Sequence, residues 1–530
     1  MKLSLSFFCL LLSSVLLSQE HQVRFDQIDV VHYEFEMELN DENDNIDATA
    51  SVSLIFKEAS TKFSLDLVGL TDGKGMTVKR VLTAKNQKLR FEHSNDLLTI
   101  YTEQAAGASG TFIVEYSGIP KTGLIIAKNK HGDRTFFGDN WPDRGKNWLP
   151  IVDHPSDKAT VQWVITAPDH YKVVGNGELI EEKPLGNGRA TTTWKSTVKI
   201  PTKVMVIGAA RFAVEESGKV RGTPISSWVY PQDEKNGFHD YALAVSITEW
   251  FINTVGPYPY AKLANVQSKT QFGGMENASN IFYSENSVRG DRSAEGLIAH
   301  EIAHQWFGNS ASEANWHHIW LSEGFATYFT TLYMEDKYGE QRAAELRLED
   351  RQQVIAYNNR VSVPVVNPSI RNYMRLLNAN SYQKGGWVLH MLRLQVGDDN
   401  FQQAIRQYYN KYKLSNALTK DLQAVFEEVS GQQLDYFFDQ WIFKAGHPEL
   451  AVAWSHNKKK IALQIDQQQE EAFIFPLTFE VTFEDGTSLK ETVKVSKKSA
   501  THTIKTSKKP VKIVLDPDTS LLFEGNVTEK

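Results

Sequence analysis

Hydrophobic and polar residues alternate in short runs from about residue 30 to residue 212. Examples are "YEFEMEL", "ATASVSLIF" and "ATVQWVIT", and glycine, asparagine, aspartate or proline separates one run from the next. A period of two places successive side chains on opposite faces of a strand. The first part of the chain is therefore predicted to be an antiparallel β-domain.

Apolar residues recur at helical spacing from about residue 238 to residue 445, and several of these segments run up to a glycine, where many helices end. The segments are "YALAVSITEWFINTVG", "AEGLIAHEIAHQWFGN", "EGFATYFTTLYMEDKYG", "SYQKGGWVLHMLRLQVG" and "TKDLQAVFEEVSG". Beyond "GHP" the alternation returns and continues to the C-terminus, which is typical of a small β-sandwich.

These changes of pattern divide the 530 residues into four parts. They are a leader at 1–18, an N-terminal β-domain at 19–211, a mainly helical domain at 212–446 and a C-terminal β-sandwich at 447–530. The arrangement predicts a multi-domain α+β protein. At about 150 residues per domain the length agrees with it.

The leader "MKLSLSFFCLLLSSVLLSQEHQ" has Lys2, then an uncharged run over 3–18, then polar residues. This order is typical of a signal peptide, which predicts export to the periplasm or the extracellular space. The run is shorter than the ~20 apolar residues of a spanning helix, so no transmembrane segment is expected after cleavage. An uncleaved membrane anchor is the alternative. The single cysteine, Cys9, lies in the leader, so the mature chain has no disulfide.

Composition narrows the functional classes. The formal net charge is −7, whereas nucleic-acid-binding proteins concentrate basic charge on one face, so no nucleic-acid partner is expected. Ordinary apolar, aromatic and charged fractions argue against a disordered or coiled-coil protein. The sequence does not indicate an oligomeric state.

The stretch "AHEIAHQWFGN" carries His300, Glu301 and His304. Helical residues four apart lie on nearly the same face, about 6 Å apart along the axis, so both imidazoles can reach one ion. Glu301 is turned roughly 100° away, which suits a general base better than a ligand.

A catalytic zinc site needs three protein ligands and one open position. Glu323 in "WLSEGFATYF" is separated from His304 by eighteen residues and begins a second predicted helix. His300, His304 and Glu323 are therefore predicted to hold one Zn²⁺, although cobalt or manganese can occupy such ligands. The alternative is that the two histidines simply belong to a helix core. Requiring a glutamate at one fixed later spacing makes a chance occurrence of the whole pattern roughly sixteen times rarer. His317 and His318 are expected to be loop or helix-start residues.

"HEIAH", eighteen residues and a glutamate resemble the gluzincin metallopeptidases, specifically the aminopeptidase N family, which includes leukotriene hydrolase. Thermolysin-like endopeptidases have a similar arrangement with slightly different spacing. "GGMEN" resembles the aminopeptidase signature Gly-x-Met-Glu-Asn, which implies substrate-binding roles for Gly273, Gly274, Met275, Glu276 and Asn277. In that family the glutamate, here Glu276, binds the free α-amine of the substrate. The chemistry agrees, because a carboxylate suits an ammonium group and glycines permit close backbone approach.

"SYQKGGWVLHML" resembles the family's Tyr-x-Lys-Gly segment. The resemblance implies that the Tyr382 hydroxyl stabilises the oxyanion of the reaction, and Lys384 is expected to be a solvated helix residue. Similar segments occur in the first domain, "FFGDNWPDRGKNWLPIVDHPSDKAT", and at the junction with the last, "FFDQWIFKAGHPELAV". The resemblance therefore covers nearly the whole mature chain and implies a thermolysin-like catalytic domain between two β-domains.

The sequence departs from the family in two places. Many relatives have a first-domain glutamine that helps to hold the amine, and the nearest positions here are Asp139 and Asn140. Relatives also have a helical C-terminal domain that walls off the active site. This sequence ends after the β-sandwich, so we expect a more open cleft.

These observations predict an exported zinc aminopeptidase that acts on peptides with a free N-terminus, with Glu301 as general base and Tyr382 stabilising the oxyanion. A zinc endopeptidase is one alternative, although Glu276 would be an odd charge to place along an internal peptide. The other is a non-catalytic binding protein on a peptidase scaffold, which would have no chemical need for Glu301 or Tyr382.

Overall fold

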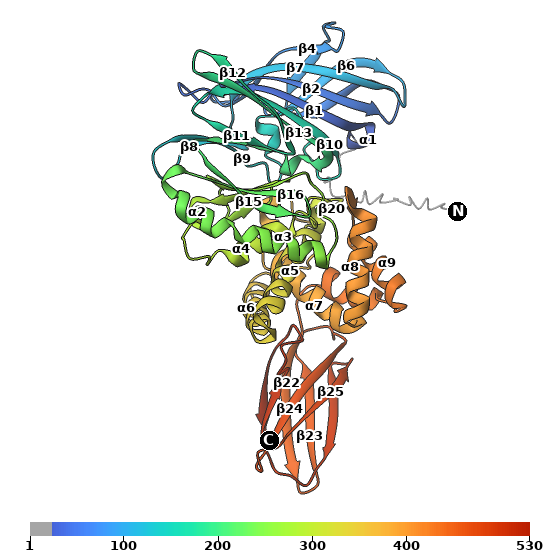
Figure 1. The fold of residues 1–530 in the computed structure, drawn as a ribbon. Coiled ribbons are helices and arrows are strands. Elements are labelled where there is room, and N and C mark those ends of the chain that lie inside the picture. The colour runs from blue at the N-terminus through green and yellow to red at the C-terminus, as the bar shows by residue number, and fades with distance from the viewer. Residues whose placement is uncertain (1–23) are drawn as a thin grey trace, which may run out of the picture.

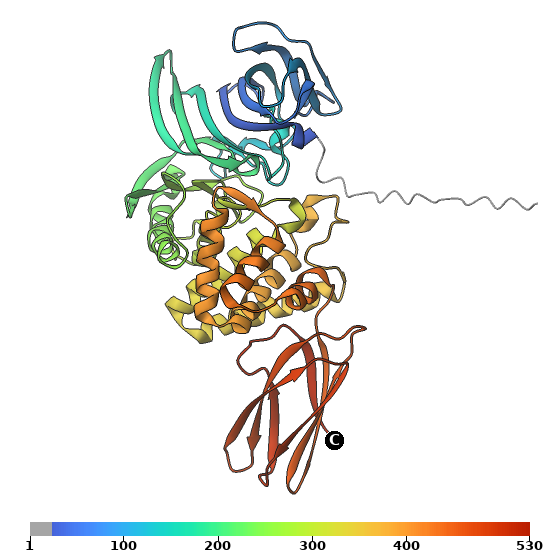
Figure 2. The same cartoon turned by 90° about the vertical axis from the view of Figure 1, so that its right-hand side faces the viewer.

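The computed structural model describes residues 24–530, so the predicted signal peptide at 1–18 lies outside the described residues. Figures 1 and 2 show the N-terminal strands at one end of an elongated molecule, the helices in the middle and the C-terminal strands at the other end. The predicted fold class is confirmed in this order of β-rich, helical and β-rich regions. Within residues 24–530, no helix is long and apolar enough to cross a membrane.

The N-terminal region is built around a seven-stranded sheet. Its strands, in spatial order, are β12 (Glu178–Gly186), β13 (Arg189–Pro201), β10 (Lys158–Pro168), β1 (Ile28–Glu38), β2 (Ile46–Phe56), β7 (Ser109–Ile119) and β4 (Gly75–Thr83). Side chains of β2 alternate between buried and more exposed positions, as the period of two predicts. Only antiparallel pairing was expected, but β1 and β10 pair in parallel. Alternation reveals which face a side chain occupies and carries no information on strand direction.

Two smaller sheets complete this region. One consists of β3 (Ser60–Asp66), β6 (Leu97–Gln104) and β5 (Phe91–Ser94); the other consists of β11 (Lys172–Gly175), β14 (Ile207–Ala210), β9 (Arg134–Gly138) and β8 (Leu124–Lys128). The segment that follows β9 contains Trp141, which takes part in the site described below.

The middle region begins with a five-stranded mixed sheet that the sequence did not predict. Its strands, in spatial order, are β15 (Ala213–Val220), β16 (Thr223–Val229), β17 (Leu263–Ser268), β19 (Asn280–Ser284) and β18 (Gly274–Met275). Every residue of β17 is buried, so this strand shows no alternation along the sequence. The short edge strand β18 contains Gly274, the second glycine of "GGMEN", and pairs with β19.

Helices form most of the rest of the middle region, together with a two-stranded sheet of β20 (Ala311–Glu313) and β21 (Ser415–Ala417). The helices are α2 (Glu234–Tyr241), α3 (Leu243–Thr254), α4 (Glu295–Ala303), α5 (Trp320–Tyr338), α6 (Glu340–Asn358), α7 (Gly385–Val396), α8 (Asp398–Tyr412), α9 (Thr419–Ser430) and α10 (Asp435–Phe438). The long helix α5 packs against α4 on one side and α7 on another.

Two glycines allow α5 and α7 to approach closely. A Cβ atom on Gly324 would lie 2.8 Å from the Cα atom of Gly385, and one on Gly385 would lie 2.9 Å from the Cα atom of Gly324. No side chain fits between backbones at that separation. The contact brings the π-helical turn before α7, Asn380–Lys384, next to Glu323 at the start of α5.

The C-terminal region is the predicted β-sandwich. One sheet has the order β26 (Ser499–Lys505), β23 (Lys460–Gln467), β22 (Glu449–Asn457), β28 (Glu524–Glu529); the other has the order β25 (Ser488–Val495), β24 (Phe475–Phe483), β27 (Pro510–Leu515). Arg351 on α6 joins it to the helices through an ion pair, with its Nη2 2.5 Å from Oδ2 of Asp516.

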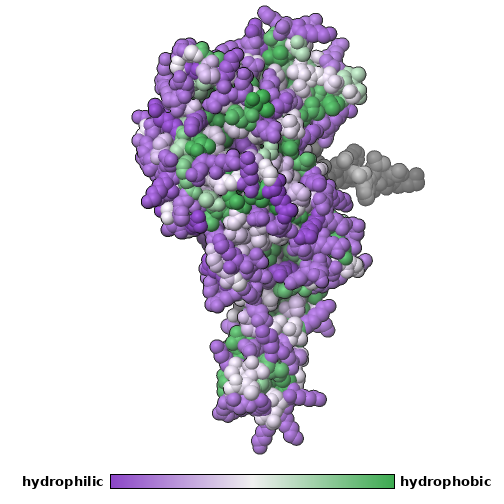
Figure 3. Space-filling model, viewed as in Figure 1, coloured by the Kyte–Doolittle hydropathy of each residue, from purple (hydrophilic) through white to green (hydrophobic). Residues whose placement is uncertain are grey.

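Buried lysines fix the N-terminal region to the middle region. Nζ of Lys203 lies 2.5 Å from Oε1 of Glu313, and both side chains are almost fully buried. Nζ of Lys158 donates to the carbonyl oxygens of Asn309, Ser310 and Ser415. These charged contacts lie inside the molecule and hold the two regions in one arrangement. On the face seen in Figure 3, hydrophobic residues gather in separate groups among hydrophilic ones.

Candidate active site

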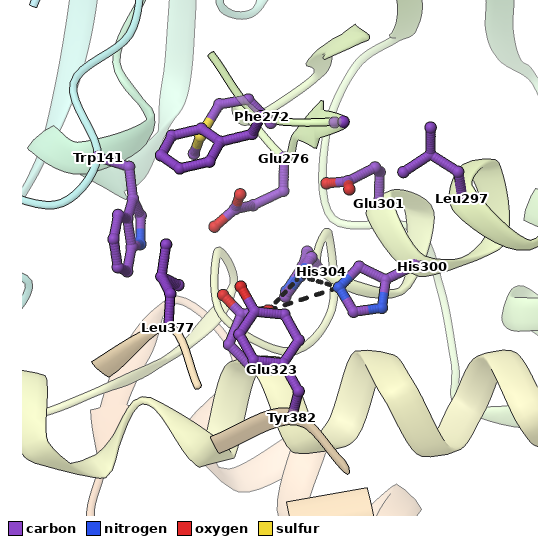
Figure 4. Close-up of a pocket in the computed structure, with 13 residues that line it drawn as sticks. Trp141, Phe272, Glu276, Leu297, His300, Glu301, His304, Glu323, Leu377 and Tyr382 are labelled. Atoms are coloured by element: carbon purple, nitrogen blue, oxygen red, sulfur yellow. Dashed lines mark hydrogen bonds and ion pairs between the residues drawn. The ribbon is translucent and has the colours of Figure 1, made fainter. Parts of the chain in front are cut away.

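The predicted metal ligands converge at the end of α4 (Figure 4). Nε2 of His304 lies 3.2 Å from Nε2 of His300 and 3.2 Å from Oε2 of Glu323, and the His300–Glu323 distance is 3.5 Å. The three ligand atoms all lie within 4.8 Å of one another. Two imidazole nitrogens and one carboxylate oxygen at this spacing could hold a zinc ion with a further position open.

The turn after α4 orients His304. Its Nδ1 lies 3.2 Å from the carbonyl oxygen of Phe307, which can only accept, so Nδ1 carries the proton and Nε2 is left free as a ligand. Nδ1 also lies 3.0 Å from Oγ of Ser322. Gly308 makes this turn with φ of +117°, and a Cβ there would come within 2.1 Å of the same Oγ. The local sequence therefore fixes the ring that faces the cluster.

Charge at the cluster favours a cation. Burial lowers the pKa of His300. Burial also disfavours protonated His304, but the nearby carboxylates, Glu323 foremost, outweigh it and raise the His304 pKa to about 10. The surrounding negative charge thus stabilises a positive charge between these side chains, which a divalent metal ion would supply.

Glu301 faces the opposite side of the cluster from Glu323, beneath strand β18. Burial raises its pKa well above the ordinary glutamate value, and the carboxylates of Glu276 and Glu323 add to the effect. A Cβ on Gly274 would lie 2.3 Å from Oε1 of Glu301, whereas one on Gly273 would meet only Leu297, 3.7 Å away. A side chain at 274 would therefore displace the Glu301 carboxylate, which lies directly against the backbone there.

Glu276 points its carboxylate into the cavity (Figure 4). The residue is 5% exposed, and no group of the described residues hydrogen-bonds its Oε1. Its backbone oxygen accepts from Nε2 of Gln305 at 2.9 Å and from Nδ2 of Asn309 at 2.5 Å. No motif in the sequence marks either residue; their position just after His304 is the only signal. The loop that ends the metal-binding helix thus fixes the backbone of Glu276.

Asn277 differs from the sequence prediction. Of the described residues that line the cavity, Gly273 to Glu276 are members and Asn277 is not. Its N–H donates to the carbonyl oxygen of Met275, and its own carbonyl oxygen accepts from Asn280. Asn277 therefore shapes the turn after β18 and lies outside the set of residues that line the cavity.

Tyr382 reaches the cluster from the π-helical turn before α7. Its ring stacks on that of His300, with centroids 6.0 Å apart and planes 7° apart. Burial raises the pKa of Tyr382 well above its ordinary value, and the Glu323, Glu276 and Glu301 carboxylates act in the same direction. The phenol therefore stays protonated and can serve as a hydrogen-bond donor.

Lys384 is not the solvated residue that the sequence suggested. It is 0% exposed, and its Nζ donates to the carbonyl oxygen of Gly446 at 2.8 Å, just before the C-terminal sandwich. Burial lowers the pKa of Lys384 to about 7.

Neither Asp139 nor Asn140 is among the described residues that line the cavity. Oδ1 of Asp139 lies 2.5 Å from Nη2 of Arg144. The Asn140 amide donates to the carbonyl oxygens of Thr202 and Met205 and accepts from the indole of Trp148. The N-terminal region instead contributes the next residue, Trp141, which the sequence analysis did not single out.

The two other histidines lie away from the cluster, as expected. Nε2 of His317 is 2.9 Å from the carbonyl oxygen of Ile370, and Nδ1 of His318 is 2.8 Å from Oγ1 of Thr419. Burial lowers the pKa of His318 to about 4. Both residues belong to the short helical turn before α5, Trp316–His318, and contribute to packing there.

The assembled cavity has a volume of about 270 Å³. Its lining consists of Trp141, Phe272, Gly273, Gly274, Met275, Glu276, Leu297, His300, Glu301, His304, Glu323, Leu377 and Tyr382. In Figure 4 the imidazoles lie to one side of Glu276, and Trp141 and Leu377 lie to the other. The arrangement can hold a metal ion, move a proton and bind an ammonium group.

Two known domain families match this chain. The peptidase M1 N-terminal domain matches residues 30–204, and the peptidase family M1 domain matches residues 242–441. These two ranges include most of the N-terminal strands and all of the cluster residues.

Curated relatives carry several aminopeptidase names. Alanine/arginine aminopeptidase of Saccharomyces cerevisiae is 29% identical over 67% of this chain and 44% of its own length. Glutamyl aminopeptidase of Homo sapiens is 25% identical over 81% of this chain and 48% of its own. Leucyl aminopeptidase of Saccharolobus solfataricus is 25% identical over 79% and 54%. The chain spans about half the length of these relatives.

The fold is also similar to a solved structure. The crystal structure of Legionella pneumophila aminopeptidase A in complex with aspartic acid superposes with a TM-score of 0.81 at 18% identity. The match covers 94% of this chain and 60% of that one. At this identity the likeness concerns the fold alone.

Proposed function

The chain belongs to peptidase family M1, and on this premise we propose that it is a zinc-dependent aminopeptidase that removes the N-terminal residue from peptides with a free α-amine. One observation carries the proposal. The buried carboxylate of Glu276, with Oε1 unpaired among the described residues, faces the cluster of His300, His304 and Glu323. An ammonium partner for that carboxylate would place the first peptide bond of a substrate beside the cluster.

The two Nε2 atoms and the Glu323 carboxylate would hold the zinc ion, and the donor set fits this metal. When bound, zinc supplies Lewis-acid polarisation of the scissile carbonyl and lowers the pKa of water. The hydrogen bond from Nδ1 of His304 to the Phe307 carbonyl keeps Nε2 available as a ligand.

Glu301 takes a proton from the attacking water and then delivers it to the nitrogen of the leaving peptide. Its surroundings raise its pKa, which suits a carboxylate that has to hold this proton between the two steps. Tyr382 donates a hydrogen bond to the carbonyl oxygen, and this bond strengthens as negative charge develops there.

Glu276 sets the register of the substrate. A charge-assisted hydrogen bond to the ammonium group fixes the first residue, and the next carbonyl group then lies at the cluster. An acetylated N-terminus offers no positive charge and would leave a buried carboxylate without a partner, which is costly. Blocked peptides are therefore excluded.

We also propose export, from the leader sequence alone. N-terminal sequencing of the mature protein should begin at Gln19.

The test uses one peptide in free and N-acetylated forms. The zinc-loaded enzyme should release residues one at a time from the free form only, and a chelator should abolish release. Glu276→Ala should lower kcat/KM for the free form at least a hundredfold, whereas Glu428→Ala, an exposed glutamate on α9, should not. Internal cleavage of the acetylated form would indicate an endopeptidase. No cleavage of either form would leave a binding protein as the better reading.

A further inference from the structure

We propose that the enzyme prefers large apolar first residues such as leucine, methionine or phenylalanine, and that Trp141 of the N-terminal region determines this specificity. The inference rests on the proposed function and names its substrate class.

Four apolar side chains form this wall: Trp141, Phe272, Met275 and Leu377. Figure 4 shows Trp141, Phe272 and Leu377 on the far side of Glu276 from His300. A substrate with its ammonium group at Glu276 and its first carbonyl at the cluster has its side chain left to occupy this space. The first side chain therefore meets the apolar wall.

The wall is rigid. Trp141 is 2% exposed, and its indole packs edge-to-face against Phe272 at 6.2 Å and against Trp316 at 5.7 Å between ring centroids. The backbone oxygen of Trp141 accepts a hydrogen bond from Nε of Arg144 at 2.7 Å. A preformed apolar pocket can discriminate by size, because its shape does not adjust to a smaller side chain.

Charged first residues find no free partner on this wall. One cation lies near the wall: the carbon Cζ of Arg144 is 5.7 Å from the Phe272 ring centre. Its guanidinium is paired with Asp139, whose side chain is 1% exposed. The carboxylates that line the cavity, those of Glu276, Glu301 and Glu323, belong to its other side, so a charged first side chain directed at this wall would be buried against uncharged groups, which is costly.

The first experiment measures kcat/KM for aminoacyl-coumarin amides with free amines and different first residues. Leucine, methionine and phenylalanine should exceed alanine roughly ten- to a hundredfold, and glutamate and arginine should fall below alanine. Equal values for all side chains, or a preference for glutamate or arginine, would overturn the inference while the proposed function stands. No release from any substrate by zinc-loaded enzyme would contradict both.

Two variants test the wall itself. Leu377→Arg adds a cation and should raise the glutamate-to-leucine ratio at least tenfold. Leu348→Arg, which changes an exposed leucine on α6, is the matched control and should leave the ratio unchanged. Trp141→Ala should lower the leucine-to-alanine ratio at least tenfold, and Trp141→Phe should retain most of the preference. Unchanged ratios in Leu377→Arg and Trp141→Ala would show that Trp141 does not determine the specificity for the first residue.

A binding measurement separates recognition from turnover. L-Leucinamide should raise the Tm of the metal-free enzyme more than glycinamide does, since both carry the ammonium group and only one carries the side chain. The difference should disappear in Trp141→Ala. Equal Tm shifts for the two amides in the unaltered enzyme would contradict the proposal that the apolar wall binds the first side chain.

Discussion

One side of the cavity presents the imidazoles of His300 and His304 and three carboxylates, and the other presents the rings of Trp141 and Phe272 with the alkyl group of Leu377. The charged side comes from neighbouring helices and a strand within a single region. The apolar side needs a residue from the N-terminal region. Charged groups that stabilise a transition state act on the backbone that every peptide shares, whereas an apolar wall acts on the side chain that differs between peptides. The two sides should therefore control different quantities.

The largest effect is expected for Glu301→Gln, a substitution on the charged side of the cavity. The amide cannot accept the proton, so kcat should fall by a factor on the order of 10²–10⁴. The factor should be the same for leucyl and alanyl substrates, because Glu301 does not touch the side chain. Metal analysis should show one zinc ion per chain as before. A loss that depends on the first residue would break the division between the two sides.

Tyr382→Phe removes one hydroxyl group from the charged side. We expect kcat to fall by roughly 10²–10³ and KM to change little, because the hydrogen bond strengthens only as the oxyanion forms. Tyr357→Phe is the control, since Tyr357 lies on α6 in a groove that adjoins Tyr382. Equal effects of the two substitutions would show that the Tyr382 hydroxyl has no special role.

Gly274→Ala and Gly273→Ala form a matched pair on adjacent residues. The new methyl group at 274 would collide with the Glu301 carboxylate, whereas at 273 it would meet only Leu297 in ordinary contact. Displacing Glu301 by about 1 Å should lower kcat/KM about a hundredfold, and the change at 273 should cost no more than a few-fold. Similar losses in both variants would mean that the strand itself, and not Glu301, limits substitution.

Lys384→Met tests a buried lysine two residues after Tyr382 in the π-helical turn. Burial lowers the native pKa of Lys384 to about 7, below its value in the unfolded chain. Between about pH 7 and pH 10 the unfolded chain therefore binds more protons, and stability rises with pH by up to about 1.4 kcal/mol per unit. This contribution should be missing from Lys384→Met. The unfolding midpoint of the unaltered protein should therefore rise relative to that of the variant between pH 7 and pH 9. Lys411→Met, an exposed lysine on α8, should follow the unaltered protein. Parallel curves for Lys384→Met would contradict a neutral buried lysine.

The charged side could be predicted from sequence because its parts are close in the chain and chemically unusual. His300 and His304 share a helix face by geometry alone, and Glu323 begins the next long helix. The "GGMEN" and "SYQKGG" segments likewise combine residue types that few structural turns require together. Most of the site therefore follows from local spacing and a family resemblance.

The apolar side could not be predicted in this way. A tryptophan in a loop of a β-domain is most often a core residue, and its sequence neighbours Asp139 and Asn140 drew attention by their polarity. Trp141 lines the cavity because the N-terminal region is fixed in place by distant contacts, including the buried pair of Lys203 and Glu313. Such long-range contacts leave no periodic signal.

Lys384 and the central sheet illustrate the same limit. Nothing in "YQKGG" shows that the chain returns 62 residues later and places the carbonyl of Gly446 beside the Lys384 amine. Strand β17 is buried on both faces, so its residues vary in polarity without the alternation that identifies a strand with one exposed face. Burial created by tertiary packing was the missing information in both cases.

The hydrogen bonds from Gln305 and Asn309 to the Glu276 carbonyl connect two affinities that are usually measured separately. Both donors lie in the turn that follows His304. Under the proposed function, an ion that orders this turn would also order the carboxylate that receives the amine. The two binding events would then share one free-energy cycle, and each would strengthen the other by the same factor. Metal affinity would thus report how firmly the protein holds the start of a peptide.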